Sequence, residues 1–323
     1  MAFNARGLLF AETEKCFLND LTRAFDVAEN PGGVADKVAF VPVHRGHDPC
    51  GLRRVFHPCL TSSNVRKARL LDMQNDPFVH WFEGLERRHM ANLNFSEVRR
   101  AVQALSSIYV ERRNRIDTGA AFSGAGKRAA FATYFAPIHF LLVREIVRKL
   151  EARVPANVAI LDLGCGTGAA SAAWALELAG QPRVVGVDRN SWALQECRWT
   201  YEQFGIRGTV RSAEISMLRI PASTAVIAAF TINELDPAAR DRFRRDLSTT
   251  AHRGAPVLIV EPIARRLTSW WDDWANDWRV LGGRQDEWRF RVDLPERLTL
   301  MDRAAGLDHR ELTGRSLWLP AVA

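Results

Sequence analysis

Apolar residues recur at helical spacing over the first third of the chain. This spacing predicts three helices, over residues 5–29, 77–90 and 96–115. Residues 34–64 are rich in proline and glycine and predict a long loop. The small residues of segment 119–126 predict a linker, so we expect residues 1–125 to form a helical N-terminal domain.

Beyond this linker the pattern changes to short apolar runs that alternate with helical segments. The runs predict five strands, over residues 158–163, 183–187, 209–211, 225–230 and 257–260. Helices are predicted on either side of the first strand, over residues 137–153 and 169–179. Because strands that alternate with helices form parallel sheets, we expect residues 126–323 to adopt a doubly wound, mostly parallel α/β fold of the Rossmann-like kind.

Composition indicates a soluble globular protein. The 323 residues are 47% apolar and 25% charged. No window reaches the ~18 uninterrupted apolar residues of a membrane helix, so no membrane association is expected. Glu12 and Glu14 interrupt the start of the chain where a leader would be apolar or free of acids, and the five cysteines show no pairing pattern. We therefore expect a cytoplasmic protein.

The net charge of +7 permits an anionic partner such as RNA without requiring one. Only five of the 44 basic residues are lysine, a bias that a GC-rich coding sequence would produce whatever the function. The arginines of the helix at 96–115 lie largely off its apolar stripe, which favours a solvated face over a phosphate-binding one. Charge alone therefore does not predict a nucleic-acid module.

The strongest motif is a glycine loop that follows the first predicted strand. Residues 159–169 read AILDLGCGTGA, with glycines at 164, 166 and 168 and Cys165 between the first two. Glycine permits positive φ and lets a ligand approach the main chain closely. The loop also presents its N–H groups and a helix N-terminus to that ligand. We therefore assign Gly164, Cys165, Gly166 and Gly168 to a nucleotide cofactor.

Two cofactor classes use such a loop. The spacing of Gly164, Gly166 and Ala169 fits a dinucleotide fingerprint, and the longer pattern that begins at Asp162 fits an S-adenosylmethionine loop. Asp162 favours the second class, because a carboxylate sits awkwardly beside a pyrophosphate but can hold the ammonium group of a methionine moiety.

Further cofactor contacts are predicted at the ends of the next two strands. Asp188 lies 20 residues after Gly168, where its carboxylate can accept hydrogen bonds from both ribose hydroxyls. Arg189 and Trp192 follow, and Trp192 either stacks on adenine or packs its own helix. Glu214 reaches the adenine amino edge or is an ordinary surface residue.

With these motifs in place, residues 130–265 resemble a class I S-adenosylmethionine-dependent methyltransferase. The loop at 162–168, Asp188 and the segment 230–235 match that family's main landmarks. The resemblance implies S-adenosyl-L-methionine as cofactor and methyl transfer as the activity. More narrowly, ATYFAP at 132–137, NEL at 233–235 and LIVEP at 258–262 are similar to the methyltransferase-like proteins of the small ribosomal subunit. Those relatives carry a cysteine cluster after the fifth strand, whereas residues 263–292 contain no cysteine, so no metal centre is predicted there.

Three residues are candidates for the chemistry. Asn233 and Glu234 follow the fourth strand, whose end faces the methyl group in this fold. Asn233 can orient an acceptor, and Glu234 can take a proton, hold a cationic substrate, or pair with arginines of the next helix. Tyr134 either closes the site or belongs to the core.

Two other clusters are weaker candidates. Trp270, Trp274 and Trp278 fall on one helical face, which predicts core packing more than an aromatic wall over an acceptor. Histidines and cysteines gather within residues 44–59, but their spacing fits no standard zinc pattern, so no metal ligand is assigned.

The sequence therefore predicts a methyltransferase whose N-terminal helical domain covers the acceptor side of the pocket. A small-molecule acceptor is favoured. Ribosomal RNA is the second candidate, and a cofactor-binding assembly factor without turnover is the third. The oligomeric state is not predicted.

Overall fold

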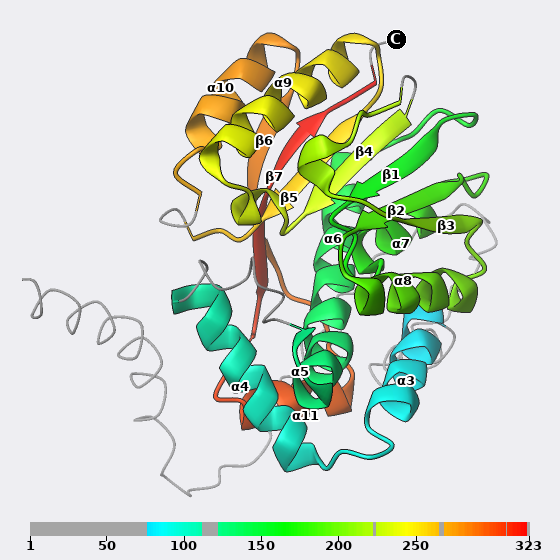
Figure 1. The fold of residues 1–323 in the computed structure, drawn as a ribbon, viewed down its shortest axis with the longest axis vertical. Helices are drawn as coiled ribbons and strands as arrows, with labels where there is room; N and C mark the ends of the chain where they lie inside the picture. Colours follow the sequence, from blue (N-terminus) through cyan, green and yellow to red (C-terminus); the bar gives the residue numbers. More distant parts are fainter. Residues whose placement is uncertain (1–75, 112–121, 222–223, 265–267, 308, 322–323) are drawn as a thin grey trace, which may run out of the picture. The chain divides into compact units, whose positions relative to one another are not determined.

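A mostly parallel sheet organises the residues that the computed structural model describes, namely 76–111, 122–221, 224–264, 268–307 and 309–321 (Figure 1). Within these residues seven strands pair in the order β3-β2-β1-β4-β5-β7-β6. The parallel strands β1 to β5 are Ala159–Leu163, Val184–Asp188, Gly208–Ser212, Thr224–Ala229 and Val257–Glu261. All five strands expected from the sequence are present, and the predicted fold class is confirmed.

Two strands at one end of the sheet were not predicted. β7 (Leu312–Leu319) runs antiparallel between β5 and the edge strand β6 (Arg284–Phe290). Most residues of β6 are polar, and all seven of its residues are exposed or only half-buried. Such a strand lacks the apolar run that identified β1 to β5, so its place depends on pairing with β7.

Helices cover both faces of the sheet (Figure 1). One side carries α6, α7 and α8, which are Ala136–Leu150, Ala169–Leu176 and Ser191–Gln203. The other side carries α9 (Pro237–His252) and α10 (Trp271–Val280). Strand β5 shows the resulting alternation, since Leu258 and Val260 belong to the first core and Val257 and Ile259 to the second. The fold is thus a three-layer, doubly wound arrangement.

The remaining helical elements pack around these layers. They are α3 (Pro77–His89), α4 (Phe95–Glu111), α5 (Ala125–Ala130), the π-helical turn η3 (Phe131–Phe135), η4 (Ile215–Met217), η5 (Ile232–Glu234) and α11 (Glu296–Ala304). The expected helices at 77–90, 96–115 and 137–153 are confirmed to within a few residues. The helix expected at 5–29 lies outside the described residues.

Helix α3 shares its core with the sheet-covering helices. Trp81 is 1% exposed, packs 5.4 Å from the ring of Phe140 on α6, and donates a hydrogen bond to Thr200 on α8. Glu196 on α8 is buried and accepts hydrogen bonds from Arg88 and His89 at the end of α3. Burial alone would raise the pKa of Glu196, but these partners outweigh it and lower the pKa.

All described residues belong to one compact unit, 60–323, and a separate domain at 1–125 stays a prediction.

The longest apolar helical run, Ala125–Leu150, is long and apolar enough to cross a membrane by length and composition alone. Its most apolar window is 72% buried inside the protein. A helix that is apolar on most sides and covered by its own protein is a core helix. The tryptophan stripe predicted near α10 is also part of the core, because Trp270, Trp274 and Trp278 are buried in the second core. The core interpretation of that stripe is confirmed.

Candidate functional site

A pocket of about 380 Å³ opens at the carboxyl ends of β1, β2 and β4. This edge is where open α/β sheets bind ligands, in the crevice where the strand order reverses. Here the reversal falls between β1 and β4. The volume lies within the range of small-molecule sites, roughly 300–1,000 Å³. Eight of the twelve predicted site residues line the pocket, namely Asp162, Gly164, Cys165, Gly166, Asp188, Arg189, Glu214 and Glu234. The other four, Gly168, Trp192, Tyr134 and Asn233, lie outside the lining.

The three loop glycines all have positive φ, which is 70° at Gly164, 51° at Gly166 and 79° at Gly168. Their surroundings differ. A Cβ on Gly164 would collide with the side chain of Thr231, and one on Gly168 would lie 2.8 Å from Sγ of Cys197. At Gly166 the nearest atom to such a Cβ is in the ring of Phe131, 3.7 Å away. Gly166 therefore faces the pocket, whereas Gly168 allows α7 to pack closely on α8.

Asp188 connects the end of β2 to this loop. Its Oδ2 accepts a hydrogen bond from the Gly166 N–H at 3.0 Å, and its Oδ1 accepts one from the Asn190 N–H at 2.8 Å. A carboxylate has about four lone-pair positions, so each oxygen can still accept another hydrogen bond. Asp188 can thus hold the loop and receive ligand hydroxyls at the same time.

Asp162 is a buried carboxyl group in the pocket lining. It is 1% exposed, and its Oδ2 has no hydrogen-bond partner among the described residues. Burial raises the pKa of this carboxyl to about 7, although hydrogen bonds from Ser171 oppose the rise. An orphaned buried oxygen calls for an explanation, and a positively charged ligand group would supply one. The residues therefore fit a ligand with an ammonium group.

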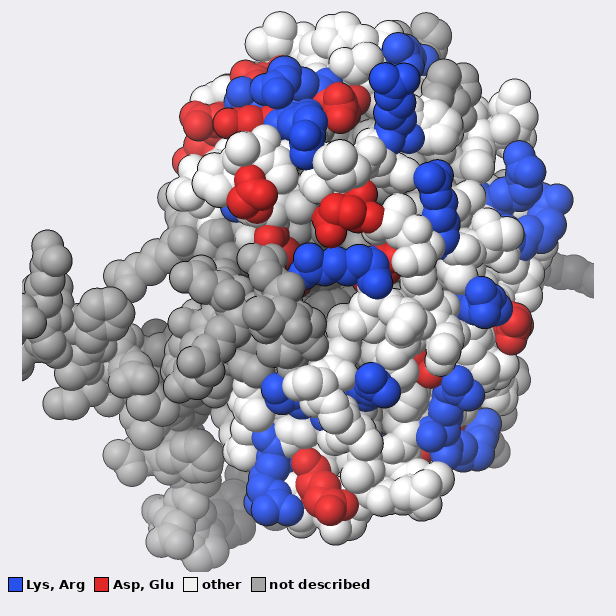
Figure 2. Space-filling view, in the orientation of Figure 1, with Lys and Arg blue, Asp and Glu red and all other residues white. Residues whose placement is uncertain are grey.

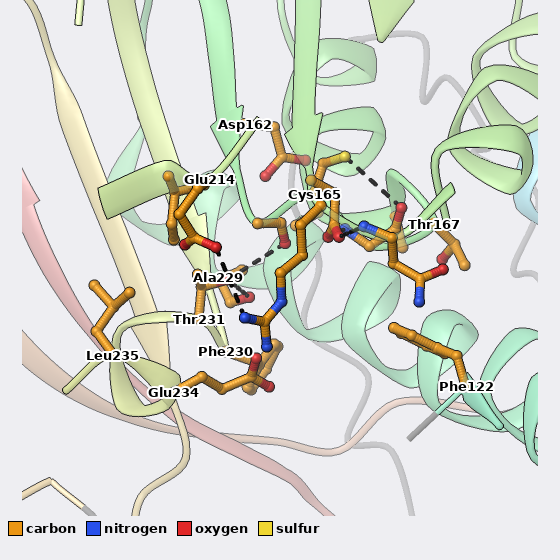
Figure 3. A pocket seen from close by; sticks show the side chains of 18 of the residues that line it. Phe122, Asp162, Cys165, Thr167, Glu214, Ala229, Phe230, Thr231, Glu234 and Leu235 are labelled. Carbon is orange, nitrogen blue, oxygen red and sulfur yellow. Dashed lines mark hydrogen bonds and ion pairs between the residues drawn. The ribbon is translucent and has the colours of Figure 1, made fainter. Parts of the chain in front are cut away.

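The lining also includes Arg189, which follows β2, and Glu214, which follows β3 and is labelled in Figure 3. Their charged groups approach to 3.7 Å, and both side chains are about half exposed. Trp192 is not in the lining. Its ring packs 5.0 Å from Phe122, a lining residue, and beneath the guanidinium of Arg128. The structure therefore supports the packing interpretation of Trp192 over adenine stacking.

Cys165 lines the pocket with its thiol directed at the loop itself. Its Sγ lies 3.7 Å from the carbonyl oxygen of Gly166 (Figure 3). Burial raises the pKa of Cys165 well above its ordinary value. The thiolate is the nucleophilic form of cysteine, and the raised pKa disfavours it. We therefore assign Cys165 to packing within the loop.

At the end of β4 the structure separates two neighbours that the sequence grouped together. Glu234 lines the pocket, but Asn233 does not. The Asn233 side chain donates to Glu261 at 2.6 Å and accepts from the indole N–H of Trp270 at 2.9 Å. Asn233 therefore braces η5 against β5 and the segment before α10, and the structure does not place it where it could orient an acceptor.

Tyr134 is likewise occupied away from the pocket lining. Its ring is 1% exposed, and its hydroxyl donates to Oδ1 of Asp302 on α11 at 2.5 Å. Burial and this hydrogen bond raise the pKa of the Tyr134 hydroxyl far above its ordinary value. Asp302 also accepts from the N–H of His309 at 2.8 Å. Tyr134 thus joins η3 to α11, which supports its core interpretation.

Sequence reasoning missed the aromatic side of the pocket. Phe122, Phe131, His139 and Phe230 all line it, the first from the segment expected to be a linker. The available signal was His139, a polar ring inside an otherwise apolar helical run that directly precedes the glycine-loop strand. Among the residues that the structure describes, no group of histidine, cysteine and acidic side chains could hold a metal, and the cluster at 44–59 lies outside them.

Comparison with known proteins agrees with this site. Residues 160–254 match the family model described as a methyltransferase domain. No match was found among curated proteins. Together with the strand order and the glycine loop, this match supports a class I S-adenosylmethionine-dependent methyltransferase domain around residues 160–254. S-adenosylmethionine is accordingly its cofactor, and the resemblance to ribosomal relatives stays a prediction.

Similar solved structures include several methyltransferases. Magnesium protoporphyrin IX methyltransferase from Synechocystis, with bound S-adenosylmethionine, is 15% identical over 56% of this chain and 78% of its own, with a TM-score of 0.37. A methyltransferase from Aquifex aeolicus is 13% identical over 57% and 93%, with a TM-score of 0.39. A tRNA (uracil-54, C5)-methyltransferase from Pyrococcus abyssi is 17% identical over 55% of this chain and 37% of its own, with a TM-score of 0.35. These similarities do not indicate the acceptor.

Replacement of Asp188 by alanine tests the ribose contact. We expect Asp188→Ala to weaken S-adenosylmethionine binding at least about tenfold, because charge-assisted hydrogen bonds are lost. Isothermal titration calorimetry measures the affinity. Asp241→Ala, an exposed carboxylate on α9, is the matched control and should bind as the wild type does. Equal affinity of Asp188→Ala and wild type would refute the ribose role.

Replacement of Tyr134 by phenylalanine tests its assignment to the core. We expect Tyr134→Phe to lower the free energy of unfolding by about 1–2 kcal/mol, because buried Asp302 loses a hydrogen-bond donor. Cofactor affinity should stay within about twofold of wild type. Urea unfolding and calorimetry measure the two quantities. A large loss of affinity with unchanged stability would return Tyr134 to the binding site.

Proposed function

We propose that this protein transfers a methyl group from S-adenosylmethionine to a heteroatom of a small molecule. The charge of the pocket carries the proposal. Five of its lining residues are acidic and one is arginine; the acids are Asp162, Asp188, Glu214, Glu234 and Asp236. Such a lining disfavours a phosphate backbone and suits a cationic cofactor with an uncharged acceptor.

Each part of the cofactor has a candidate partner. Asp188 would accept from the ribose hydroxyls, Glu214 lies at the adenine end, and Asp162 would hold the ammonium group. The cofactor supplies a methyl group on a positively charged sulfur. The task left to the protein is mainly to position an acceptor lone pair against that methyl group, and positioning alone supplies much of the rate.

The face seen in Figure 2 gives RNA binding no added support. On the side seen in Figure 2, basic and acidic side chains are interspersed among uncharged ones rather than gathered into one basic field. Nucleic-acid modules typically present such a field. An RNA acceptor and a role without turnover are therefore kept as alternative outcomes of the test below. A cytoplasmic location is part of the proposed function.

A labelling experiment distinguishes the three possibilities. The protein is incubated with methyl-tritiated S-adenosylmethionine and either a metabolite extract or purified ribosomal RNA. We expect label in the low-mass fraction, accompanied by release of S-adenosylhomocysteine. Label in RNA would overturn the small-molecule proposal. Cofactor binding without release of S-adenosylhomocysteine in either fraction would indicate a protein without turnover.

The raised pKa of Asp162 predicts a pH dependence of cofactor binding. The ammonium group needs the ionised carboxylate, so affinity should fall about tenfold per pH unit below about 7 and level off above it. The cofactor's α-amino group stays protonated over pH 5.5–7.5, because such groups titrate near 8. Calorimetry over this range measures the effect.

Asp162→Asn is the matched control for this pH dependence. It should bind more weakly and show a flat profile, since the amide does not titrate. Stability provides a second check with its own sign. The folded pKa of Asp162 lies above its ordinary value of 3.8, so the unfolding free energy of the unliganded protein should fall as pH rises from about 4 to 7. A pH-independent affinity in the wild type would contradict the ammonium assignment.

A further inference from the structure

His139 on α6 and Phe230 at the end of β4 form a stacked pair in the pocket lining. Their ring centroids are 3.8 Å apart and the rings are 18° from parallel. Phe230 has a φ of 59°, a left-handed conformation that is strained for a bulky residue. 

Backbone strain of this kind persists only where surrounding contacts enforce it, so the fold holds this ring in place against His139.

The imidazole of His139 can accept a hydrogen bond from a ligand. Within the part of the chain that the structure describes, the contacts of His139 are ring contacts with Phe131, Phe135 and Phe230, and none is a hydrogen bond. Burial lowers the pKa of His139 to about 3, so the ring is neutral at physiological pH. A neutral imidazole has one acceptor nitrogen. Since the ring lines the pocket, a ligand donor can reach it.

The walls around this pair differ sharply in character. Phe131 lies edge-on to His139 with centroids 6.3 Å apart, and Phe122 lies edge-on to Phe131 at 4.9 Å. The lining also carries the carboxylates of Glu214 and Glu234, and Glu234 lies beside Phe230 (Figure 3). Aromatic walls favour flat ligands, and the carboxylates repel anionic ones.

We propose that the aromatic wall of Phe122, Phe131, His139 and Phe230 binds a flat, uncharged acceptor that carries an aromatic hydroxyl group, and that His139 accepts the proton of that hydroxyl. The inference rests on the proposed function and names its substrate class. His139 is then a catalytic residue, because it touches the reacting oxygen.

The proposed step balances in atoms and charge. A lone pair of the acceptor oxygen forms the new O–CH₃ bond, while the S–CH₃ bond breaks and its electron pair stays on sulfur. The hydroxyl proton passes to His139, which later releases it to solvent. The positive charge thus moves from the sulfonium to the imidazolium, and the pocket gains no net charge. A weakly basic imidazole suffices, because a protonated ether oxygen is a far stronger acid than an imidazolium.

Other acceptor classes fit the lining less well. A carboxylate or phosphate acceptor would meet the acidic side chains of the pocket. An amine is protonated at neutral pH, has no lone pair in that state, and would place a second cation beside the sulfonium. An aromatic hydroxyl is uncharged at neutral pH and donates one strong hydrogen bond.

Ligand binding tests this inference independently of turnover. The full chain, saturated with S-adenosylhomocysteine, is titrated at pH 6.5 with 7-hydroxycoumarin and with coumarin, which lacks the hydroxyl. We expect wild type to bind the hydroxylated probe about 3–10-fold more tightly. In His139→Phe, which keeps a ring against Phe230, that preference should vanish. With S-adenosylmethionine, His139→Phe should release S-adenosylhomocysteine at least about 100-fold more slowly in the presence of 7-hydroxycoumarin.

Two further variants keep the test decisive. His252→Phe on α9 alters an exposed histidine whose hydrogen bond within the described residues is to Ser248 of the same helix, and it should match wild type in every measurement. If His139→Phe fails to fold, His139→Gln replaces it, since its amide oxygen preserves an acceptor; the binding preference should persist while turnover falls.

The outcomes separate this inference from the proposed function. Equal binding of the two probes by wild type, or an unchanged preference in His139→Phe, would overturn the inference while S-adenosylmethionine-dependent transfer stands. Label transfer to amines but not to 7-hydroxycoumarin would also overturn it. Failure of the wild type to bind S-adenosylmethionine would instead overturn the proposed function.

Discussion

The hydrogen bonds from the Gly166 and Asn190 N–H groups to Asp188 are the constraint on which the site depends. The first bond joins the loop after β1 to the end of β2, and the second fixes the Asp188 side chain against the start of α8. The loop can cross this point only because Gly164, Gly166 and Gly168 accept positive φ, and because Gly164 leaves room for Thr231. One carboxylate therefore shapes the loop and remains available to the cofactor.

The pocket has two chemically different ends. Around the loop it offers carboxylates, including buried Asp162, whose charge is held back by burial until a cation arrives. Towards α6 and the end of β4 it offers aromatic rings and the neutral imidazole of His139. The first end suits a cationic nucleoside cofactor, and the second suits an uncharged, flat acceptor. The transferred methyl group would thus leave a cofactor bound near the carboxylates and join an acceptor bound against the aromatic side chains.

Much of the fold could be predicted because its signals are local. Apolar runs identified β1 to β5, and the spacing from Gly168 to Asp188 located the loop and the second strand end. The polar edge strand β6 carried no such run and escaped prediction. Periodicity shows that a residue belongs to a helix or strand, but tertiary packing decides whether that element borders a pocket.

The same distinction explains the site residues that the sequence misplaced. Asn233 and Glu234 are adjacent, yet one braces Glu261 and Trp270 and the other lines the pocket. Tyr134 is turned towards Asp302, while His139, five residues on, reaches the cavity. Tyr134 itself lies in a π-helical turn, Phe131–Phe135, which changes the register of side chains along this helical run, and sequence periodicity does not reveal such a turn.

A crystal structure of the full chain with S-adenosylhomocysteine tests the central claim most directly. The account predicts ribose hydroxyls on Asp188, the amino group beside Asp162, and the sulfur directed towards Phe230 and His139. A nucleoside bound elsewhere, or a crevice closed by protein side chains with Asp162 still unpartnered, would contradict it.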